Sequence, residues 1–298
     1  MANIVLLDGG MGQELLARTG DEPTPLWATQ VMIDHPDVVR QIHADYFAAG
    51  ATVATTNSYA IHHDRLIAFD RDHMFESLHR KALQQAKEAR AAHGSGRIAG
   101  SLGPLMASYR PDLCPPANEA AVKYAEIVAL QAPHVDFFLC ETMASVDQAE
   151  GALKGAAGCG KPVWLSVTVD DADGTRLRSG EPLTLLKPVL ERYRPDAVLV
   201  NCSVPEAMGQ AMAIMAGFGL PFGAYANGFT HITDAFREDR PTVASLHART
   251  DLTPERYAAF AMGWVALGAT IVGGCCEVGP AHIAELARQL RAAGHRII

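Results

Sequence analysis

Short, nearly continuous apolar runs alternate along this chain with longer segments in which apolar residues recur at helical spacing. Runs without the polar alternation of a half-exposed strand are typical of parallel strands that are buried on both faces. The eight runs are IVLLDGG (4–10), ATVATTN (51–57), RIAGSLG (97–103), VDFFLCET (135–142), PVWLSVTV (162–169), AVLVNCS (197–203), PFGAYAN (221–227) and TIVGGCC (270–276). Between them, segments such as residues 118–133 bring Ala, Tyr, Ile, Val and Leu round to one helical face.

Eight strand-then-helix units in 298 residues predict an α/β fold, a single (β/α)8 barrel. A doubly wound open sheet is the main rival, but it usually has fewer strands. No linker and no low-complexity segment divides the chain, so we expect one domain over residues 1–298. In such a barrel, function lies at the carboxyl ends of the strands and in the loops that follow them.

Composition and charge limit the classes of partner that this protein could bind. The chain is 49% hydrophobic and 19% charged, with a formal net charge of −8 and no stripe of Lys or Arg, so nucleic acid and anionic membranes are poor partners. The chain starts without a signal peptide, and no stretch approaches the roughly 20 apolar residues that span a bilayer. Six cysteines in a chain of this length do not make a disulfide framework. We therefore expect a cytoplasmic protein; the sequence makes no prediction of its oligomeric state.

The predicted strand ends carry polar and sulfur-bearing side chains. They are Asp8 after the first strand, Asn57 after the second, Glu141 after the fourth, Asn201 and Cys202 after the sixth, and Cys275 and Cys276 after the eighth. Since one strand separates the sixth from the eighth, the three cysteines can converge. Cys140 should point away from Glu141, and we interpret it, like Cys114 and Cys159, as a small packing residue.

Three cysteine thiolates in one place would bind only a few kinds of metal centre. Soft sulfur ligands select zinc, copper(I) or iron–sulfur clusters, and a cluster or a structural zinc site usually takes four protein ligands. Three ligands leave one position open, as in a catalytic zinc site. Zinc held by three thiolates is a weak Lewis acid for water but suits a further thiolate, which indicates a thiol substrate alkylated on sulfur. The alternative is that the three cysteines are only small buried residues.

The motifs LLDGGMGQEL, ATTNS, GSLGP, ETM and VNCS, with GGCC followed by Pro-x-His-Ile, resemble those of the homocysteine S-methyltransferases. The match runs in order from residue 4 to about residue 290. Members of that family are zinc-dependent (β/α)8 barrels. The resemblance implies that Cys202, Cys275 and Cys276 hold zinc, and that homocysteine sulfur takes the open position.

The resemblance also implies substrate contacts. Asp8 and Glu141 correspond to the acids that hold the amino group of homocysteine, and an ammonium ion in a partly dry pocket needs charge-assisted acceptors. Gly9, with Gly10 and the backbone of TTNS, is a candidate support for the substrate carboxylate. Asn57 and Asn201 are candidates to hydrogen-bond the substrate or to orient Cys202.

The methyl donor is less well determined. A compact barrel is most similar to the members that use S-methylmethionine or S-adenosylmethionine to form methionine. Betaine, another onium compound or a methyl-folate is the alternative donor, and a corrinoid-partnered subunit or a non-catalytic zinc- or thiol-binding protein are further alternatives. The chain departs from many relatives at residues 225–229 and 277–280, over the pocket. Candidate aromatic contacts for a cationic donor are Tyr59, Tyr109, Tyr225 and Phe229.

Three loops have no assigned role. Residues 58–75 include His62, His63, Asp64 and His73, which could form a second metal site but fit a solvated loop better. Residues 170–180 resemble a calcium loop without its terminal Glu, and we interpret them as a loop that can close over a ligand. Residues 228–242 resemble a lid that could help to select the donor, and the role of the whole loop 228–250 is not assigned.

Overall fold

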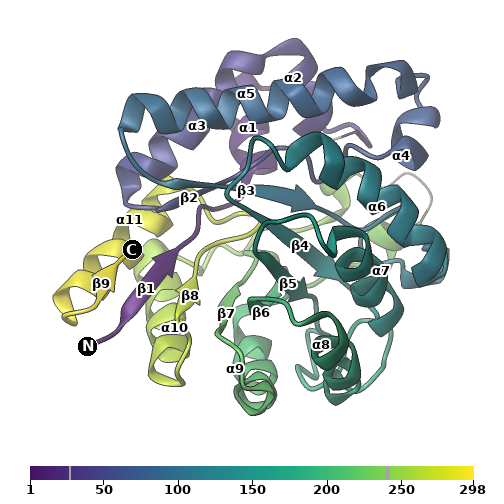
Figure 1. The fold of residues 1–298 in the computed structure, drawn as a ribbon. Helices are drawn as coiled ribbons and strands as arrows, with labels where there is room; N and C mark the ends of the chain where they lie inside the picture. The colour runs from purple at the N-terminus through teal and green to yellow at the C-terminus, as the bar shows by residue number, and fades with distance from the viewer. Residues whose placement is uncertain (27, 239–241) are drawn as a thin grey trace.

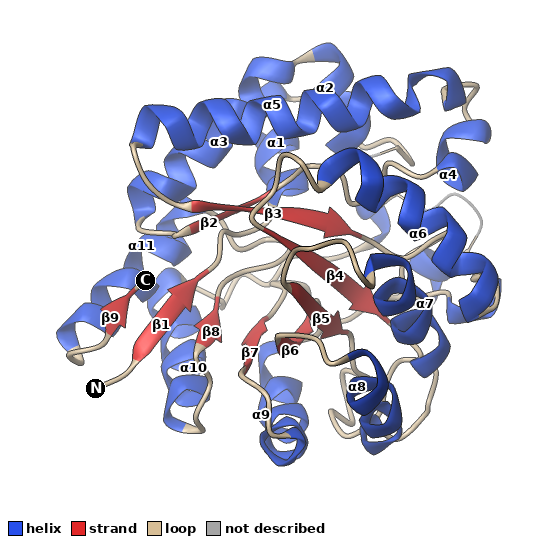
Figure 2. Cartoon of the chain, viewed as in Figure 1, coloured by secondary structure: helices blue, strands red, loops and turns tan. Residues whose placement is uncertain are grey.

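A computed structural model describes residues 1–26, 28–238 and 242–298. Its parallel strands form one curled sheet that is surrounded by helices (Figures 1 and 2). The strands are β1 (Asn3–Leu6), β2 (Val53–Thr55), β3 (Arg97–Leu102), β4 (Phe137–Met143), β5 (Val163–Val167), β6 (Ala197–Asn201), β7 (Phe222–Tyr225), β8 (Ile271–Val272) and β9 (Arg296–Ile297). Their order in the sheet is β2-β3-β4-β5-β6-β7-β8-β1-β9. The predicted α/β barrel fold is confirmed.

The helices cover the outer face of the sheet, as Figure 2 shows in blue. They are α1 (Met11–Thr19), α2 (Ala28–Asp34), α3 (Pro36–Ala49), α4 (His63–Ile67), α5 (Phe75–His93), α6 (Ala117–Gln131), α7 (Val146–Ala156), α8 (Lys187–Tyr193), α9 (Pro205–Met215), α10 (Pro254–Ala266) and α11 (Pro280–Ala292). Short 3-10 helices lie at Asp72–Met74, Pro111–Leu113, Leu183–Leu186, Ala216–Phe218, Asp234–Arg237 and Val243–Ser245. None of the described helices is long and apolar enough to span a bilayer.

The strands are apolar on both faces because each face meets a separate core. Side chains such as Val5, Leu139 and Leu199 fill the inside of the barrel. Their neighbours along the strands, such as Ile4 and Cys140, pack outward against the helices. Side chains alternate between these two faces along each strand, and because both faces are buried the runs are apolar throughout. The same alternation places Cys140 and Glu141 on opposite faces of β4 as predicted.

The ninth strand and the seam beside β1 were not predicted. β9 pairs with Asn3 and Ile4 in β1, so it occupies the edge that β2 would otherwise take. At the other end of β1, the backbone N–H of Thr52, just before β2, donates to the carbonyl of Leu6 at 2.7 Å. β2 therefore meets only the carboxyl end of β1. Figure 1 shows both chain ends beside this seam.

Strand β8 is shorter than its apolar run because glycines interrupt it. A Cβ on Gly274 would lie 2.2 Å from a methyl group of Val278, and one on Gly9 would lie 2.1 Å from the Val278 carbonyl oxygen. The loops after β1 and β8 can therefore approach each other closely only because both positions lack side chains. This approach brings Cys275 and Cys276 beside the loop that carries Asp8.

Candidate metal and substrate site

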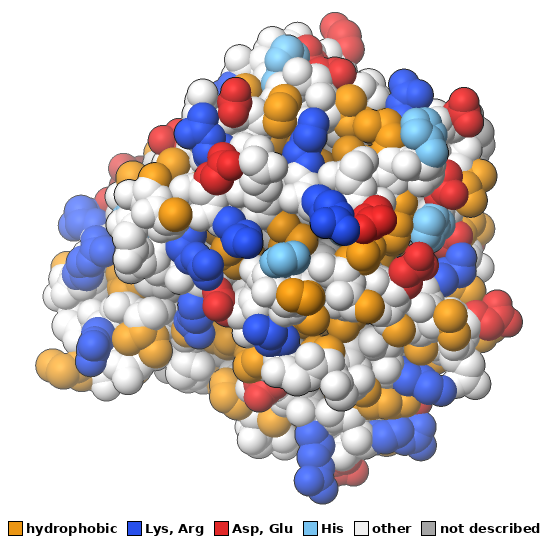
Figure 3. Space-filling model, turned by 45° about the horizontal axis from the view of Figure 1, so that its top comes forward, with side chains coloured by type: hydrophobic (Ala, Val, Ile, Leu, Met, Phe, Trp, Pro, Cys, Tyr) orange, Lys and Arg blue, Asp and Glu red, His pale blue; other side chains and the backbone are white. Residues whose placement is uncertain are grey.

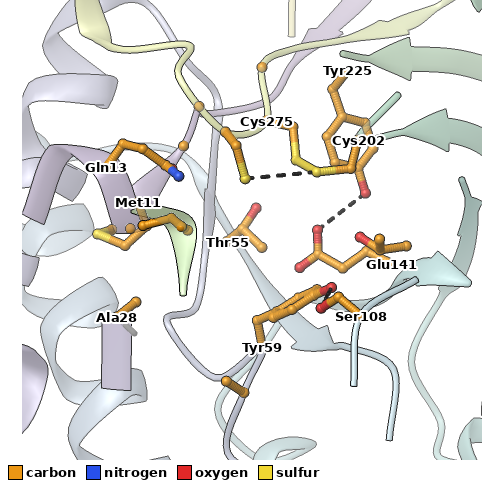
Figure 4. A pocket seen from close by; sticks show the side chains of 18 of the residues that line it. Met11, Gln13, Ala28, Thr55, Tyr59, Ser108, Glu141, Cys202, Tyr225 and Cys275 are labelled. Atoms are coloured by element: carbon orange, nitrogen blue, oxygen red, sulfur yellow. Dashed lines mark hydrogen bonds between the residues drawn. A yellow bond between two sulfur atoms is a disulfide. The ribbon is translucent and has the colours of Figure 1, made fainter. Parts of the chain in front are cut away.

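A cavity of about 110 Å³ opens at the carboxyl ends of the strands. Its walls come from the loops after β1, β2, β3, β6, β7 and β8 and from the end of β4, as the barrel fold predicts. The cysteines Cys202, Cys275 and Cys276 and the acids Asp8 and Glu141 all line it. Figure 4 shows Glu141 and the Tyr225 hydroxyl pointing toward each other below the sulfur atoms of Cys202 and Cys275.

The three cysteines come together from two strand ends. Their Sγ atoms all lie within 4.8 Å of one another, and no other group of three potential metal ligands as close as this exists among the described residues. Cys202 has a φ of +53°, and Glu277, next to Cys276, has a φ of +63°. Non-glycine residues seldom adopt this left-handed conformation, which costs about 1–3 kcal/mol and clusters at functional sites. Backbone strain thus accompanies the convergence of the sulfur atoms.

The structure pairs Cys202 with Cys275 in a disulfide, with their Cα atoms 5.7 Å apart, and leaves Cys276 free. We did not predict this bond. A disulfide and a metal site are alternative states of the same side chains, because a metal binds thiolates. Burial, and then the charge of Glu277, raises the pKa of the Cys276 thiol to about 12. Its sulfur therefore stays protonated unless a cation binds it.

Thr55 holds Asp8 in place. Its backbone N–H donates to one carboxyl oxygen of Asp8 at 2.6 Å, and its hydroxyl donates to the other at 2.8 Å. Burial raises the pKa of Asp8 to about 7 despite these bonds, and the charge of Glu141 adds to the rise.

Glu141 lies across the cavity on β4. It accepts hydrogen bonds from the hydroxyls of Ser101 and Tyr225, the latter at 3.3 Å. Burial raises its pKa to about 7. Among the described residues that line the cavity there is no Lys, Arg or His to balance the two acids. Two buried carboxyl groups without a cation make a site for a ligand with a positive charge.

The other predicted substrate contacts differ in position. Gly9 lines the cavity at the close approach of the loops after β1 and β8. Asn57 also lines it, but its side-chain amide donates to the carbonyl of Ala28 at 3.1 Å. Asn201 lies outside the described lining. Its side chain bonds to the backbone N–H and the hydroxyl of Thr142 at 3.0 and 2.8 Å, so it supports the residue after Glu141.

A buried ion pair behind Cys202 was missed by the sequence analysis. Arg178 and Asp171, in the loop after β5, approach to 2.8 Å with side-chain exposures of 4% and 16%. Arg178 donates to the carbonyl of Cys202 at 3.3 Å, and Asp171 accepts from the N–H of Val204 at 3.0 Å. The loop thus holds the backbone around Cys202, and none of residues 170–180 lines the cavity. A charged pair in a loop gave no signal in the sequence, because its partners are backbone atoms of another strand end.

Aromatic residues form another part of the wall. Tyr59, Tyr109, Tyr225 and Phe229 all line the cavity, together with Phe236, which the sequence analysis missed. The Arg178 guanidinium lies 4.9 Å from the ring centre of Tyr109, and Phe236 packs against the same ring at 5.9 Å. In the predicted lid, residues 239–241 lie outside the described residues; Val243 and Leu246, which follow the lid, also line the cavity.

The adjacent histidines of loop 58–75 have separate surroundings, His63 partly exposed beside two acids and His62 buried. His63 lies between Asp72 and Glu126, with nitrogen-to-oxygen distances of 2.5 and 3.4 Å, and it stacks on Phe75. His62 is buried with its ring edge-on to Tyr124. These residues do not converge on a second three-ligand site among the described residues.

Comparison with known proteins decides the family. A family model described as homocysteine S-methyltransferase matches residues 5–290. The chain belongs to the homocysteine S-methyltransferase family. Homocysteine S-methyltransferase of Escherichia coli (strain K12) is 30% identical over 305 residues, covering 95% of this chain and 94% of that protein. Homocysteine S-methyltransferase 4 of Zea mays is 30% identical over 322 residues, covering 97% and 90%.

Solved structures agree with the homocysteine S-methyltransferase assignment. The metallated form of the homocysteine methyltransferase MmuM from Escherichia coli superposes with a TM-score of 0.80 at 27% identity, over 96% of each chain. The oxidised form of MmuM superposes with a TM-score of 0.81. The predicted family and the predicted class of methyltransferase enzyme are therefore confirmed.

Proposed function

We propose that this protein transfers a methyl group from an S-methyl sulfonium, S-methylmethionine or S-adenosylmethionine, to the sulfur of L-homocysteine, forming methionine. We propose further that zinc is its metal, held by Cys202, Cys275 and Cys276. One observation carries the proposal: a single cavity joins three sulfur atoms, all within 4.8 Å of one another, to two buried carboxyl groups. Family membership supplies homocysteine as the thiol that such a cavity would take.

The donor set fits zinc. Three soft sulfur ligands favour it over the hard cations, and three rather than four ligands leave one position for a substrate. Zinc in this site would hold homocysteine sulfur as a thiolate at neutral pH.

The acids of this chain would bind the amino group of homocysteine. Burial raises the pKa values of Asp8 and Glu141 to about 7, and an ammonium ion between them would allow both to ionise. Thr55 keeps both oxygens of Asp8 in place, and Ser101 with Tyr225 does the same for Glu141. Substrate orientation would thus rest on residues that are already fixed before binding.

The aromatic wall would receive the donor. A sulfonium carries a positive charge, and aromatic faces attract cations. Tyr109, Phe229 and Phe236 lie on this wall, whereas the Tyr225 hydroxyl is already bonded to Glu141 and therefore serves the homocysteine side. During transfer the donor's carbon–sulfur bond breaks with its electron pair going to the donor sulfur, which becomes a neutral thioether. The new bond forms on homocysteine sulfur, whose proton has passed to solvent.

The test is methionine formation from homocysteine by reduced protein, with and without prior chelator treatment. Four donors are compared: S-methylmethionine, S-adenosylmethionine, glycine betaine and a methyl-folate. We expect turnover with one of the sulfonium donors, its loss after chelation and its return with added zinc. Turnover only with betaine or the methyl-folate would overturn the donor assignment. Turnover that survives complete metal removal would overturn the zinc assignment.

A further inference from the structure

A second hollow lies at the opposite end of the barrel, where the strands begin. It has a volume of about 770 Å³ and lies between the start of β3, the ends of α3 and α5, and the pair α11 and β9. We call it the amino-end groove. In Figure 3, Lys and Arg side chains lie on the left of the surface, the side on which α11 and β9 lie in Figure 1, as well as over the rest of that face.

Three arginines from three different elements line the amino-end groove. Arg97 begins β3, Arg291 belongs to α11 and Arg296 begins β9. None of the three side chains forms an ion pair or a hydrogen bond with any described residue. Most other described arginines do, and Arg71 and Arg194, which lie elsewhere, are the remaining exceptions. No Asp or Glu is among the described residues that line the groove.

Arg97 is the most constrained of the three. Its guanidinium lies 5.8 Å from the ring centre of Phe137 and 6.0 Å from that of Trp164, at the bottom of the inner core. Its Nη2 atom is shut off from solvent and has no hydrogen-bond partner. The neighbouring acid Asp136 is already engaged by Arg90 at 2.9 Å and by the N–H of Ile98 at 2.7 Å. A buried donor without an acceptor is costly, and Arg97 also lines the groove.

Glycines keep the groove open. Gly50 and Gly96 have φ values of +108° and +107°, a conformation that other residues rarely adopt. A Cβ on Gly50 would lie 3.2 Å from Nη2 of Arg291, and one on Gly96 would lie 2.5 Å from the ring of Phe47. A side chain at either position would crowd the groove wall. The Phe47 ring in turn stacks on His93 at 5.1 Å, giving the groove a flat side.

We propose that the amino-end groove binds an organic polyphosphate, a ligand with two or three linked phosphoryl groups such as a nucleoside di- or triphosphate. Guanidinium forks match phosphate oxygens in geometry, and three of them offset the charge of a phosphate chain rather than that of a single anion. The volume is in the range of small-molecule sites. The groove lies at the other end of the barrel from the three cysteines, so its occupant is distinct from the methyl-transfer substrates.

The test is calorimetric titration of the full chain with inorganic pyrophosphate, ATP and sulfate at low ionic strength. The proteins are wild type, the double variant Arg291→Gln with Arg296→Gln, and the control Arg194→Gln, which removes an unpaired arginine outside the groove. We expect wild type and the control to bind pyrophosphate and ATP alike. The double variant should bind both at least tenfold more weakly, and added salt should weaken all binding.

Each result bears on the proposal. Equal affinity for pyrophosphate and ATP would support recognition of the phosphate chain, and tighter binding of ATP would support additional contacts with the nucleoside. No binding of either probe at millimolar concentration would overturn the proposal. So would sulfate binding as tightly as pyrophosphate, or an equal loss of affinity in the Arg194→Gln control, because both would indicate a general charge effect. None of these outcomes depends on methyl-transfer activity.

Discussion

The two ends of this barrel carry charged side chains of opposite sign. At the carboxyl end, a small cavity holds two buried acids with no basic residue among its described lining residues. At the amino end, an open groove holds three arginines with no acid among its described lining residues. The acids at the amino end, such as Asp136, are tied to arginine and backbone N–H groups.

The two ends also differ in how much their functional features lower the stability of the fold. Asp8 and Glu141 are buried carboxyl groups, and Thr142 and Cys202 have φ values of +64° and +53°. Such features lower the stability of the folded protein and persist where binding of a ligand recovers the free energy. At the amino end Arg291 and Arg296 are exposed to water, where an unpaired arginine costs little, and only Arg97 is partly shut off from solvent. Substitutions should therefore have large effects on ligand binding at the first end and small effects on stability at the second.

The largest effect is expected at the cysteines. Replacing Cys202, Cys275 or Cys276 with Ala removes one of the three proposed zinc ligands. Each variant should therefore lose its bound zinc and stay folded. Its methyl-transfer activity should fall by at least about a thousandfold. Metal content by mass spectrometry and folding by circular dichroism check this. Cys159→Ala is the matched control, because Cys159 is half-buried and outside the cavity. A full equivalent of zinc in any of the three variants would remove that cysteine from the ligand set.

Glu141→Gln should weaken homocysteine binding without removing the metal. Loss of a charged acceptor for the substrate ammonium should weaken homocysteine binding by roughly 10- to 100-fold, with zinc content unchanged. Calorimetric titration of the zinc-loaded variant measures this. The exposed Glu191→Gln is the control. Homocysteine affinity equal to that of wild type would exclude Glu141 from the substrate site.

The same variant should be more stable than wild type at high pH. Burial raises the pKa of Glu141 from 4.5 to about 7, so the folded state holds the proton more tightly than the unfolded state does. The carboxyl group therefore lowers stability as pH rises from 4.5 to 7, by up to about 3 kcal/mol. Glutamine does not titrate. Denaturant unfolding of the metal-free protein should show a gain for Glu141→Gln at pH 8 and little difference at pH 4; an equal difference at both would contradict the assignment.

A smaller effect is expected behind the proposed metal ligands. Arg178→Gln removes a hydrogen bond to the carbonyl of Cys202 and leaves Asp171 buried without its partner. Zinc affinity, measured by competition with a chelator, should fall about tenfold, as for other groups that orient metal ligands. Arg178→Lys should recover part of it. Arg176→Gln is the control in the same loop, where an exposed ion pair with Asp173 is lost. Equal losses at the two positions would indicate a general effect of the loop.

Much of the fold was predictable because each element obeys a local rule. Buried parallel strands gave continuous apolar runs, and glycines ended several helices, as at Gly50 and Gly94. The ninth strand was missed because two residues paired with β1 leave no periodic signal. The run at residues 270–276 was longer than β8 because the same glycines that look like strand residues allow the loops after β1 and β8 to meet.

The sequence by itself determined which residues reach the site. In a parallel barrel every strand ends on the same face, so Asp8, Glu141 and the three cysteines, which follow strand ends, come to the same end of the barrel. Only the tertiary structure decided what holds them: Thr55 on Asp8, Ser101 on Glu141, Arg178 behind Cys202, and the turn of Asn201 toward Thr142. The same holds for the amino-end groove. These contacts depend on how neighbouring strands and loops are aligned with one another. The sequence of a single strand does not encode the position of its neighbours.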